Sequence, residues 1–176
     1  FSGGASTSRT RRESHPAEKF AGKADITPGA TAAWAHTVFM IPKLQQLDPN
    51  QVEGNILFTV PKSSEIDRVA CKEPDLNMFL QKGVGDYIRS RLRKAGVDLN
   101  NQSVNQRLAR EGSITGHLAT IDLSSASDSV TIQLACRLLS PDWFDVLMAL
   151  RSPITMIDGE AHENQMLSSM GNGYTF

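Results

Sequence analysis

Two aspartates, Asp122 and Asp128, stand in a short polar stretch of the kind that binds a metal ion or a phosphate. Asp122 directly follows residues 118–121, whose apolar and β-branched side chains predict a short buried strand. Small polar residues at 124–129 come next, and then a predicted helix that runs to about Leu139. A carboxylate between the end of a strand and the start of a helix is a common place to hold a metal ion or a phosphate.

A structural interpretation of the same residues stays open. Ser125 as N-cap and Asp128 three residues later would form a capping box for the following helix. Asp122 would then close the turn with its own side chain.

A second group of candidates is cationic. Residues 56–60 and 66–71 predict the two strands of a hairpin, joined by a turn at 61–65. Lys62 stands at the tip of this hairpin, and Arg68 and Lys72 follow on its return. Cations spaced along such a ribbon can bind a triphosphate, because each neutralises phosphate oxygens without a proton transfer. The alternative is a charged edge strand that resists aggregation.

A third candidate is the glycine-containing loop at 168–176. Gly171 can adopt backbone conformations closed to other residues, and Ser169, Asn172 and Thr175 offer uncharged hydrogen-bonding groups. This combination suits a sugar or a template backbone, although most glycine loops are only turns.

These groups must be positioned by regular elements, of which a helix over residues 74–95 is the clearest. One buried face is predicted by apolar side chains that recur every four residues, namely Leu76, Leu80, Val84, Ile88 and Leu92. Gly83 and Gly85 predict close packing or a local break at the helix centre. Arg89 and Arg93 complement the dipole at the carboxyl end of the helix, and contact with RNA is a second role for them.

The other elements are shorter. Residues 1–30 predict a basic arm without regular structure, which either contacts RNA phosphates or is a solvated loop. Residues 31–48 predict either a short helix or an irregular packing segment, interrupted by Pro42. The remaining predicted elements are helices near 103–111 and 143–150 and a hairpin with a type I′ turn at Asp158-Gly159.

Composition narrows the classes of protein. The 176 residues carry 18 basic and 19 acidic side chains, so net charge gives no argument for binding nucleic acid. Cys71 and Cys136 are far apart and lack the spacing of zinc ligands, which indicates a reducing compartment. No apolar run has the length of a membrane span. Because the chain begins at Phe1 and stops directly after a glycine-rich stretch, we expect an internal piece of a longer protein.

Four sequence blocks, taken in order, resemble the replicase β subunit of the single-stranded RNA bacteriophages, the leviviruses. The blocks are V-P-K-S-S-E-I-D-R at 60–68, E-P-D-L-N-M-F-L-Q-K-G-V-G at 73–85, A-T-I-D-L-S-S-A-S-D-S at 119–129 and S-S-M-G-N-G-Y-T-F at 168–176. The resemblance covers roughly residues 50–176.

The resemblance implies an α+β chain that forms part of a right-hand RNA-dependent RNA polymerase. Residues 1–50 would be a basic arm and a segment of the fingers, and residues 51–115 the fingers with the nucleotide-gripping hairpin and its helix. Residues 116–176 would be the first part of the palm.

The resemblance also implies roles for the candidate residues. Asp122 would be a catalytic, metal-binding carboxylate for Mg²⁺, and its partner carboxylates would lie in a downstream G-D-D turn, which this chain lacks. The fragment alone is therefore expected to be inactive. The nucleotide-binding residues would be Lys62, Arg68, Asp128, Ser169, Gly171, Asn172 and Thr175.

The implied partners are an RNA template and nucleoside triphosphates, with host elongation factors Tu and Ts and a ribosomal protein as further partners. The implied location is the cytoplasm of the bacterial host, without a membrane. Two other classes stay open, namely a noncatalytic RNA-binding module and a structural fragment without activity.

Overall fold

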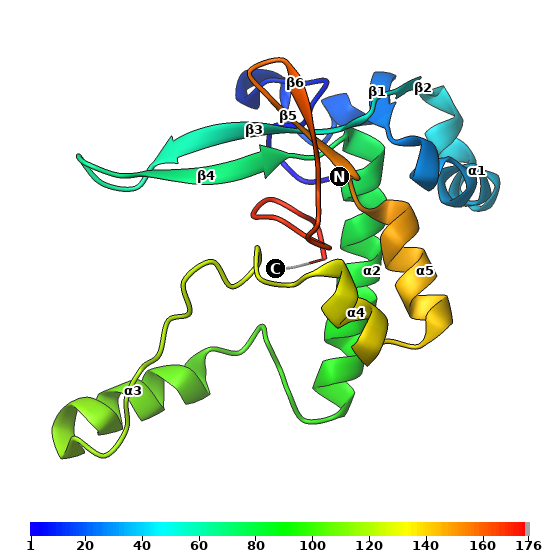
Figure 1. Cartoon of the computed structure of the whole chain (residues 1–176). Helices are drawn as coiled ribbons and strands as arrows, with labels where there is room; N and C mark the ends of the chain where they lie inside the picture. The colour runs from blue at the N-terminus through cyan, green and yellow to red at the C-terminus, as the bar shows by residue number, and fades with distance from the viewer. Residues whose placement is uncertain (175–176) are drawn as a thin grey trace.

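The computed structural model describes residues 1–174 and shows a mixed α+β chain with two small sheets (Figure 1). The strands are β1 (Gly22–Ile26), β2 (Leu47–Gln51), β3 (Gly54–Pro61), β4 (Asp67–Lys72), β5 (Ile154–Ile157) and β6 (Glu160–Glu163). The α-helices are α1 (Thr31–Met40), α2 (Asp75–Lys94), α3 (Ser103–Thr115), α4 (Ile132–Leu138) and α5 (Pro141–Leu150). Short 3-10 helices are η1 (Arg11–Glu13), η2 (Glu18–Phe20), η3 (Pro28–Ala30) and η4 (Pro42–Gln46). The predicted α+β class is confirmed.

The larger sheet has the strand order β4-β3-β5-β6 and is built from two hairpins. Strands β3 and β4 are antiparallel, with Val60 opposite Arg68, which confirms the first predicted hairpin. Strands β5 and β6 form the second, and Asp158 and Gly159 between them have φ values of 51° and 90°, as a type I′ turn requires. A parallel pairing of β3 with β5 joins the two hairpins. Figure 1 shows the β3–β4 hairpin extending away from the rest of the chain.

The N-terminal arm is more ordered than its composition predicts. Strand β1 lies within it and pairs in parallel with β2, a strand that no local pattern predicted. Ser6 and Ser8 each donate a hydrogen bond of 2.5 Å to the Asp75 carboxylate at the start of α2. The Arg9 guanidinium donates to the Ala21 carbonyl at 2.8 Å. The prediction of an irregular arm is wrong, because these long-range hydrogen bonds fix the backbone.

Helix α2 confirms the long predicted helix, but its most buried row is not the apolar one. Beyond Leu76, the apolar side chains at four-residue spacing are only partly shielded. The fully buried row is Asn77, Gln81 and Gly85, and both amide side chains are 0% exposed. Polar side chains remain buried at such positions only when they find hydrogen-bond partners, and both do.

The two central glycines of α2 differ in their surroundings. The helix runs through both without a break. A Cβ added at Gly85 would lie 2.9 Å from the carbonyl oxygen of Gly173, whereas one added at Gly83 would meet nothing within 4 Å. The predicted close packing is therefore confirmed at Gly85 alone.

Two apolar clusters hold the chain together around α2. The larger one buries Ala24, Ile26, Ala30, Trp34, Leu44, Leu47, Leu76 and Leu150. The smaller one buries Ala135, Leu147 and Leu167, and so joins α4 and α5 to the segment before the C-terminal loop. Because α5 contributes to both clusters, it fixes the C-terminal segments relative to the N-terminal sheet.

The predicted strand at Leu118–Ile121 is wrong. These residues form exposed backbone without regular structure between α3 and a turn, and the Ile121 side chain is 80% exposed. A strand needs a neighbour to accept and donate its hydrogen bonds, and within residues 1–174 no strand pairs with this segment. The segment therefore has the apolar and β-branched residues typical of a strand, but it lacks a neighbouring strand to pair with.

The capping-box interpretation is also wrong. Helix α4 begins at Ile132, and its N-cap is Thr131, whose Oγ1 accepts a hydrogen bond from the Leu134 N–H at 3.1 Å. Ser125 instead adopts a left-handed conformation with φ of 54° inside the preceding turn. Asp128 therefore has no capping role in this helix.

Within the described part of the chain, no helix is long and apolar enough to cross a membrane.

Candidate functional site

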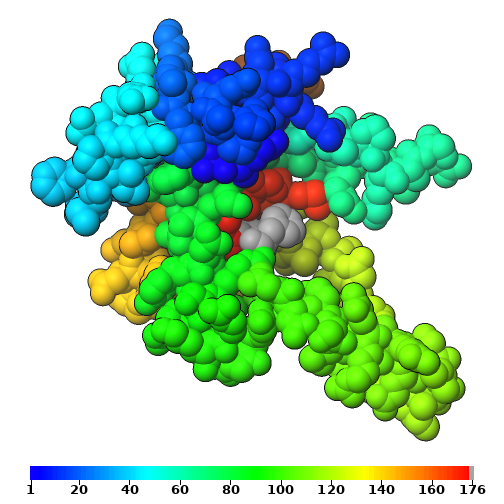
Figure 2. Space-filling model, turned by 180° about the vertical axis from the view of Figure 1, so that it is seen from behind, coloured from blue at the N-terminus to red at the C-terminus, as the bar shows by residue number. Residues whose placement is uncertain are grey.

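The C-terminal loop at residues 168–174 is seated against the base of the β3–β4 hairpin. The Cys71 N–H at the end of β4 donates to the Met170 carbonyl at 2.8 Å. Gly171 has φ of 112°, and a Cβ there would lie 2.2 Å from the Cys71 carbonyl oxygen. Both the conformation and the contact require glycine. Figure 2 shows the red surface of this loop between the hairpin and the green and yellow surface of α2, α3 and the segment that follows them.

The turn that contains Asp128 lies beside the same loop. The Leu167 N–H donates to the Val130 carbonyl at 2.8 Å, and the Ser168 hydroxyl donates to the Ser127 carbonyl at 3.4 Å. The structure therefore brings the predicted residue Asp128 to the loop that carries the candidates Ser169, Gly171 and Asn172.

The pKa of the Cys71 thiol is shifted by groups at this junction. Burial raises its pKa above the ordinary value, the neighbouring Ser169 hydroxyl lowers it in part, and the negative charges of Glu73 and Asp128 raise it further. Two predicted residues, Ser169 and Asp128, thus act on one thiol at the hairpin base. Asp128 is half-buried, and the Ser127 hydroxyl donates to its carboxylate at 3.4 Å.

Asn172 has a mainly structural environment. Its side chain is 3% exposed, and its Oδ1 accepts a hydrogen bond from the Tyr174 N–H at 3.0 Å. The Asn172 N–H donates to the Ser169 carbonyl at 3.1 Å, so this residue fixes the shape of the loop. The candidate Thr175 lies outside the described residues.

The two candidate cations, Lys62 and Arg68, lie farther out, along the projecting half of the hairpin. Lys62 is in the tip, where its backbone N–H donates to the Ile66 carbonyl at 3.0 Å, and Arg68 stands on β4. Both side chains are exposed. The hairpin thus carries Lys62 and Arg68 outward from the base where the loop and Asp128 meet, with the exposed acidic residues Glu65 and Asp67 between them in the sequence.

Asp122 lies in the exposed segment between α3 and the turn at 124–129. Within residues 1–174, its side chain accepts no hydrogen bond, so the turn-closing interpretation has no support, and no group of three potential metal ligands forms. Mg²⁺ is commonly held by one or two carboxylates together with phosphates and waters. The exposed Asp122 carboxylate fits one such ligand, and the described residues supply no complete site.

A basic groove of about 330 Å³ follows the carboxyl half of α2. Its cations are Lys82, Arg89 and Arg93, with Asp86 as the one acidic side chain among its lining residues. The Arg89 guanidinium donates to the Asn100 side chain at 3.3 Å. Arg89 and Arg93, predicted to contact RNA, therefore share one groove.

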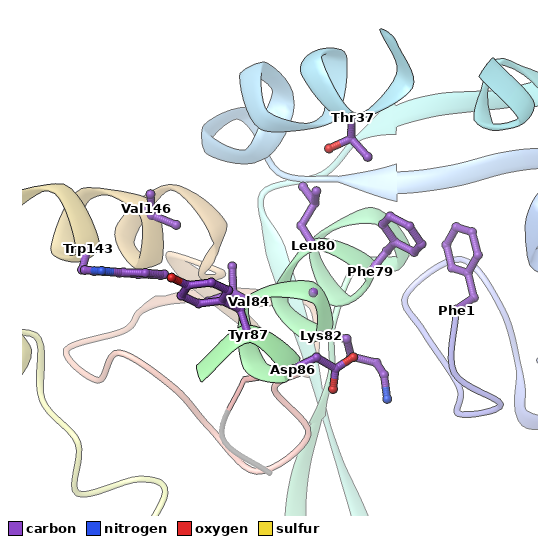
Figure 3. Close-up of a pocket in the computed structure, with 11 residues that line it drawn as sticks. Phe1, Thr37, Phe79, Leu80, Lys82, Val84, Asp86, Tyr87, Trp143 and Val146 are labelled. Carbon is purple, nitrogen blue, oxygen red and sulfur yellow. The ribbon is translucent and has the colours of Figure 1, made fainter. Parts of the chain in front are cut away.

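A larger apolar groove of about 630 Å³ runs between α2, α5 and the chain start (Figure 3). Tyr87 and Trp143 stack at one end with ring centroids 5.6 Å apart, and Phe1 and Phe79 meet at the other. None of the predicted site residues within 1–174 lines it. Its walls offer few polar groups for a triphosphate or sugar, so size alone does not make it the functional site.

A buried polar network, missed in the sequence, lies beneath the C-terminal loop. Its centre is Glu73, 1% exposed, whose carboxylate accepts hydrogen bonds from Asn55 Nδ2 (2.8 Å), Ser152 Oγ (2.8 Å) and Gln81 Nε2 (3.1 Å). Burial raises the pKa of Glu73, and these three donors lower it in part. The sequence signal was the four-residue spacing from Glu73 through Asn77 and Gln81, which continues onto the buried row of α2.

Comparison with known proteins identifies the family to which this chain belongs. The family model described as RNA replicase, beta-chain, matches residues 1–176, and the chain belongs to this family. The resemblance inferred from the four sequence blocks is thereby confirmed.

Three relatives illustrate the similarity. The chain is 48% identical over 186 residues to the RNA-directed RNA polymerase beta chain of Enterobacteria phage GA and 46% identical over 186 residues to that of Escherichia phage MS2. It is 49% identical over 181 residues to the RNA-directed RNA polymerase subunit beta of Escherichia virus Qbeta. Each match takes in 100% of this chain but only 35%, 34% and 30% of the respective relative. The chain thus spans about a third of the length of the curated relatives it matches.

Proposed function

We propose that this chain is part of an RNA-directed RNA polymerase that copies a viral RNA genome by Mg²⁺-dependent nucleotidyl transfer. The observation that carries the proposal is the junction at the hairpin base, where the loop at 168–174 and the turn of Asp128 meet a cation-bearing ribbon. In the proposed right-hand architecture, residues 1–50 are a basic arm and fingers segment, 51–115 the fingers, and 116–176 the first part of the palm.

The hairpin and the loop bind different parts of the nucleotide. Lys62 and Arg68 neutralise the triphosphate, since both cations are exposed along the projecting ribbon. Asp128, Ser169 and Gly171 lie at its base, where the sugar and the template backbone bind. Asn172 shapes this loop through its own hydrogen bond to Tyr174. Thr175 belongs to the same proposed group.

Asp122 is the proposed catalytic carboxylate. When bound, Mg²⁺ activates the attacking hydroxyl and stabilises the leaving pyrophosphate. Asp122 supplies one negatively charged ligand, and its exposure leaves room for a triphosphate beside it. Because residues 1–174 hold no cluster of three potential metal ligands, the chain alone is proposed to be inactive.

The remaining proposed partners follow from the same assignment. Arg89 and Arg93 contact RNA phosphates from the groove on α2. An RNA template and nucleoside triphosphates are the substrates. Host elongation factors Tu and Ts and a ribosomal protein are further proposed partners, in the cytoplasm of the bacterial host.

The test is Asp122→Asn in the full-length replicase that contains this chain. The change keeps the side-chain size but removes the charge that binds Mg²⁺, so RNA synthesis should fall by orders of magnitude while RNA binding persists. Asp158→Asn is the matched control, because Asp158 lies in a β-turn with φ of 51°, a conformation that asparagine also adopts. Near-normal RNA synthesis by Asp122→Asn would refute the metal-ligand role.

A noncatalytic RNA-binding module is the second candidate, favoured by the basic groove of Lys82, Arg89 and Arg93. It predicts RNA binding that is indifferent to Mg²⁺ and no loss of any activity in Asp122→Asn. Polymerisation by the full-length protein that depends on Asp122 would exclude it.

A further inference from the structure

The C-terminal loop is hydrogen-bonded to two different elements through two loop residues, Met170 and Gly173, that are three positions apart. The Met170 carbonyl accepts from Cys71 N–H at the end of β4 at 2.8 Å. The Gly173 N–H donates to Gln81 Oε1 on α2 at 2.9 Å. The position of the loop therefore depends on the positions of both β4 and α2.

The amide of Gln81 is held in one orientation. Its side chain is fully buried, and Nε2 donates both to Glu73 Oε2 at 3.1 Å and to the Leu150 carbonyl at 2.9 Å. Both partners are acceptors, so the NH₂ group must face them and Oε1 must face Gly173. A rotated amide would place NH₂ groups against the Gly173 N–H and oxygen against a carboxylate.

Glu73 fixes the other side of this arrangement. It lies where β4 passes into α2, and its Oε1 accepts from Asn55 Nδ2 on β3 at 2.8 Å. One carboxylate is thus bonded both to the base of the hairpin and to the residue that tethers the loop. Through it, the hairpin and the loop share one hydrogen-bonded support.

We infer that Gln81, held by Glu73, is a positioning residue of the nucleotide site: it keeps the C-terminal loop at a fixed place relative to the cation-bearing hairpin. The inference rests on the proposed function, because it assumes that loop and hairpin bind one nucleotide. Loss of the Gln81–Gly173 hydrogen bond leaves the reacting groups intact but lets the loop move away from α2. The binding of the incoming nucleotide is weakened as a result.

Gln81→Met tests the tether selectively. After this change the Leu150 carbonyl still accepts from Asn77 Nδ2 at 3.0 Å, and Glu73 Oε2 still accepts from Ser152 Oγ at 2.8 Å. The Gly173 N–H is then the group that loses its partner. Ser152→Ala is the matched control, since it removes a donor from the same carboxylate oxygen without touching the tether.

The measurement is steady-state RNA synthesis by the full-length replicase, with KM and kcat determined for the incoming nucleotide. Gln81→Met should raise KM about twofold to thirteenfold, the factor that one ordinary hydrogen bond represents, with kcat unchanged. Ser152→Ala should leave KM at the wild-type value. An unchanged KM in Gln81→Met, or the same rise in both variants, overturns the inference.

Gly173→Ala perturbs the same contact from the loop, with every bond of Glu73 retained. Its Cβ would lie 2.8 Å from Gln81 Cβ and 2.9 Å from the backbone nitrogen of Lys82, so the loop must move away from α2. It should raise KM as Gln81→Met does, even if the latter fails to fold, and an unchanged KM contradicts the inference. Lys62→Ala distinguishes failure of the positioning role from failure of the proposed nucleotide site. A KM rise there without one in Gly173→Ala removes only the positioning role, whereas no rise in either removes the proposed nucleotide site.

Discussion

Two alanine substitutions in the same helix should have opposite effects on stability. Gly83 and Gly85 both lie in the interior of α2, two residues apart. Replacing an exposed helical glycine with alanine stabilises a helix by about 1 kcal/mol, because alanine loses less backbone entropy on folding. Gly83→Ala should realise that gain, since its Cβ meets nothing within 4 Å.

In Gly85→Ala, steric overlap with the C-terminal loop should cancel or outweigh the same gain in helix stability. Its Cβ would lie 2.9 Å from the Gly173 carbonyl oxygen and 3.1 Å from the Tyr174 Cα, so loop backbone must shift. Overpacking of this kind costs about 1–3 kcal/mol. Set against the helical gain, the free energy of unfolding should change by between about 0 and −2 kcal/mol, leaving Gly85→Ala about 1–3 kcal/mol below Gly83→Ala.

Urea unfolding of the 176-residue chain, followed by tryptophan fluorescence, measures the difference. Equal m-values for both variants would show that the same surface is exposed on unfolding, so midpoints can be compared directly. Thermal unfolding gives a second readout, with Gly83→Ala expected to raise the midpoint by about 2–4 °C. If Gly85→Ala stabilises the chain as much as Gly83→Ala, the C-terminal loop is not seated on α2 and the tether from Gln81 loses its basis.

Three further outcomes are expected. In the full-length replicase, Lys62→Ala or Arg68→Ala should raise the nucleotide KM about tenfold through loss of a charge-assisted hydrogen bond; an unchanged KM in both contradicts their role in triphosphate binding. Asp128→Ala should weaken discrimination between ribo- and deoxyribonucleotides while changing the free energy of unfolding by no more than about 0.5 kcal/mol, because Thr131 caps the nearby helix; retained discrimination would remove Asp128 from the sugar site. Iodoacetamide should modify the exposed Cys136 well before Cys71, because burial both shields the Cys71 thiol and raises its pKa, and mass spectrometry showing equal rates would contradict the burial.

The sequence predicted the elements whose signals are local. The β3–β4 hairpin, the turn at Asp158 and Gly159, and the long helix α2 each follow from turn chemistry or a repeating apolar pattern within a few residues. The candidate residues Asp128, Ser169 and Gly171 were assigned from the resemblance to the replicase family, and the structure brings them to one junction. Their roles in binding a nucleotide stay predictions.

Long-range contacts decided what local patterns could not. Residues 118–121 have the composition of a strand but no pairing partner within the described chain, whereas β1 and β2 have weak local signals and pair with each other. Strand formation depends on a hydrogen-bonding neighbour that is distant in sequence, so composition alone cannot decide it.

The sequence by itself determined the family, the hairpin that carries Lys62 and Arg68, and the amphipathic helix beside it. Only the tertiary structure decided which face of that helix is fully buried. Gln81 and Asn77 look like solvent-facing amides in the sequence, yet both are completely buried, because Glu73, Thr27 and the Leu150 carbonyl satisfy their hydrogen bonds from other elements. A polar side chain is stable inside a protein when partners converge on it, and that convergence is a property of the fold rather than of any stretch of sequence.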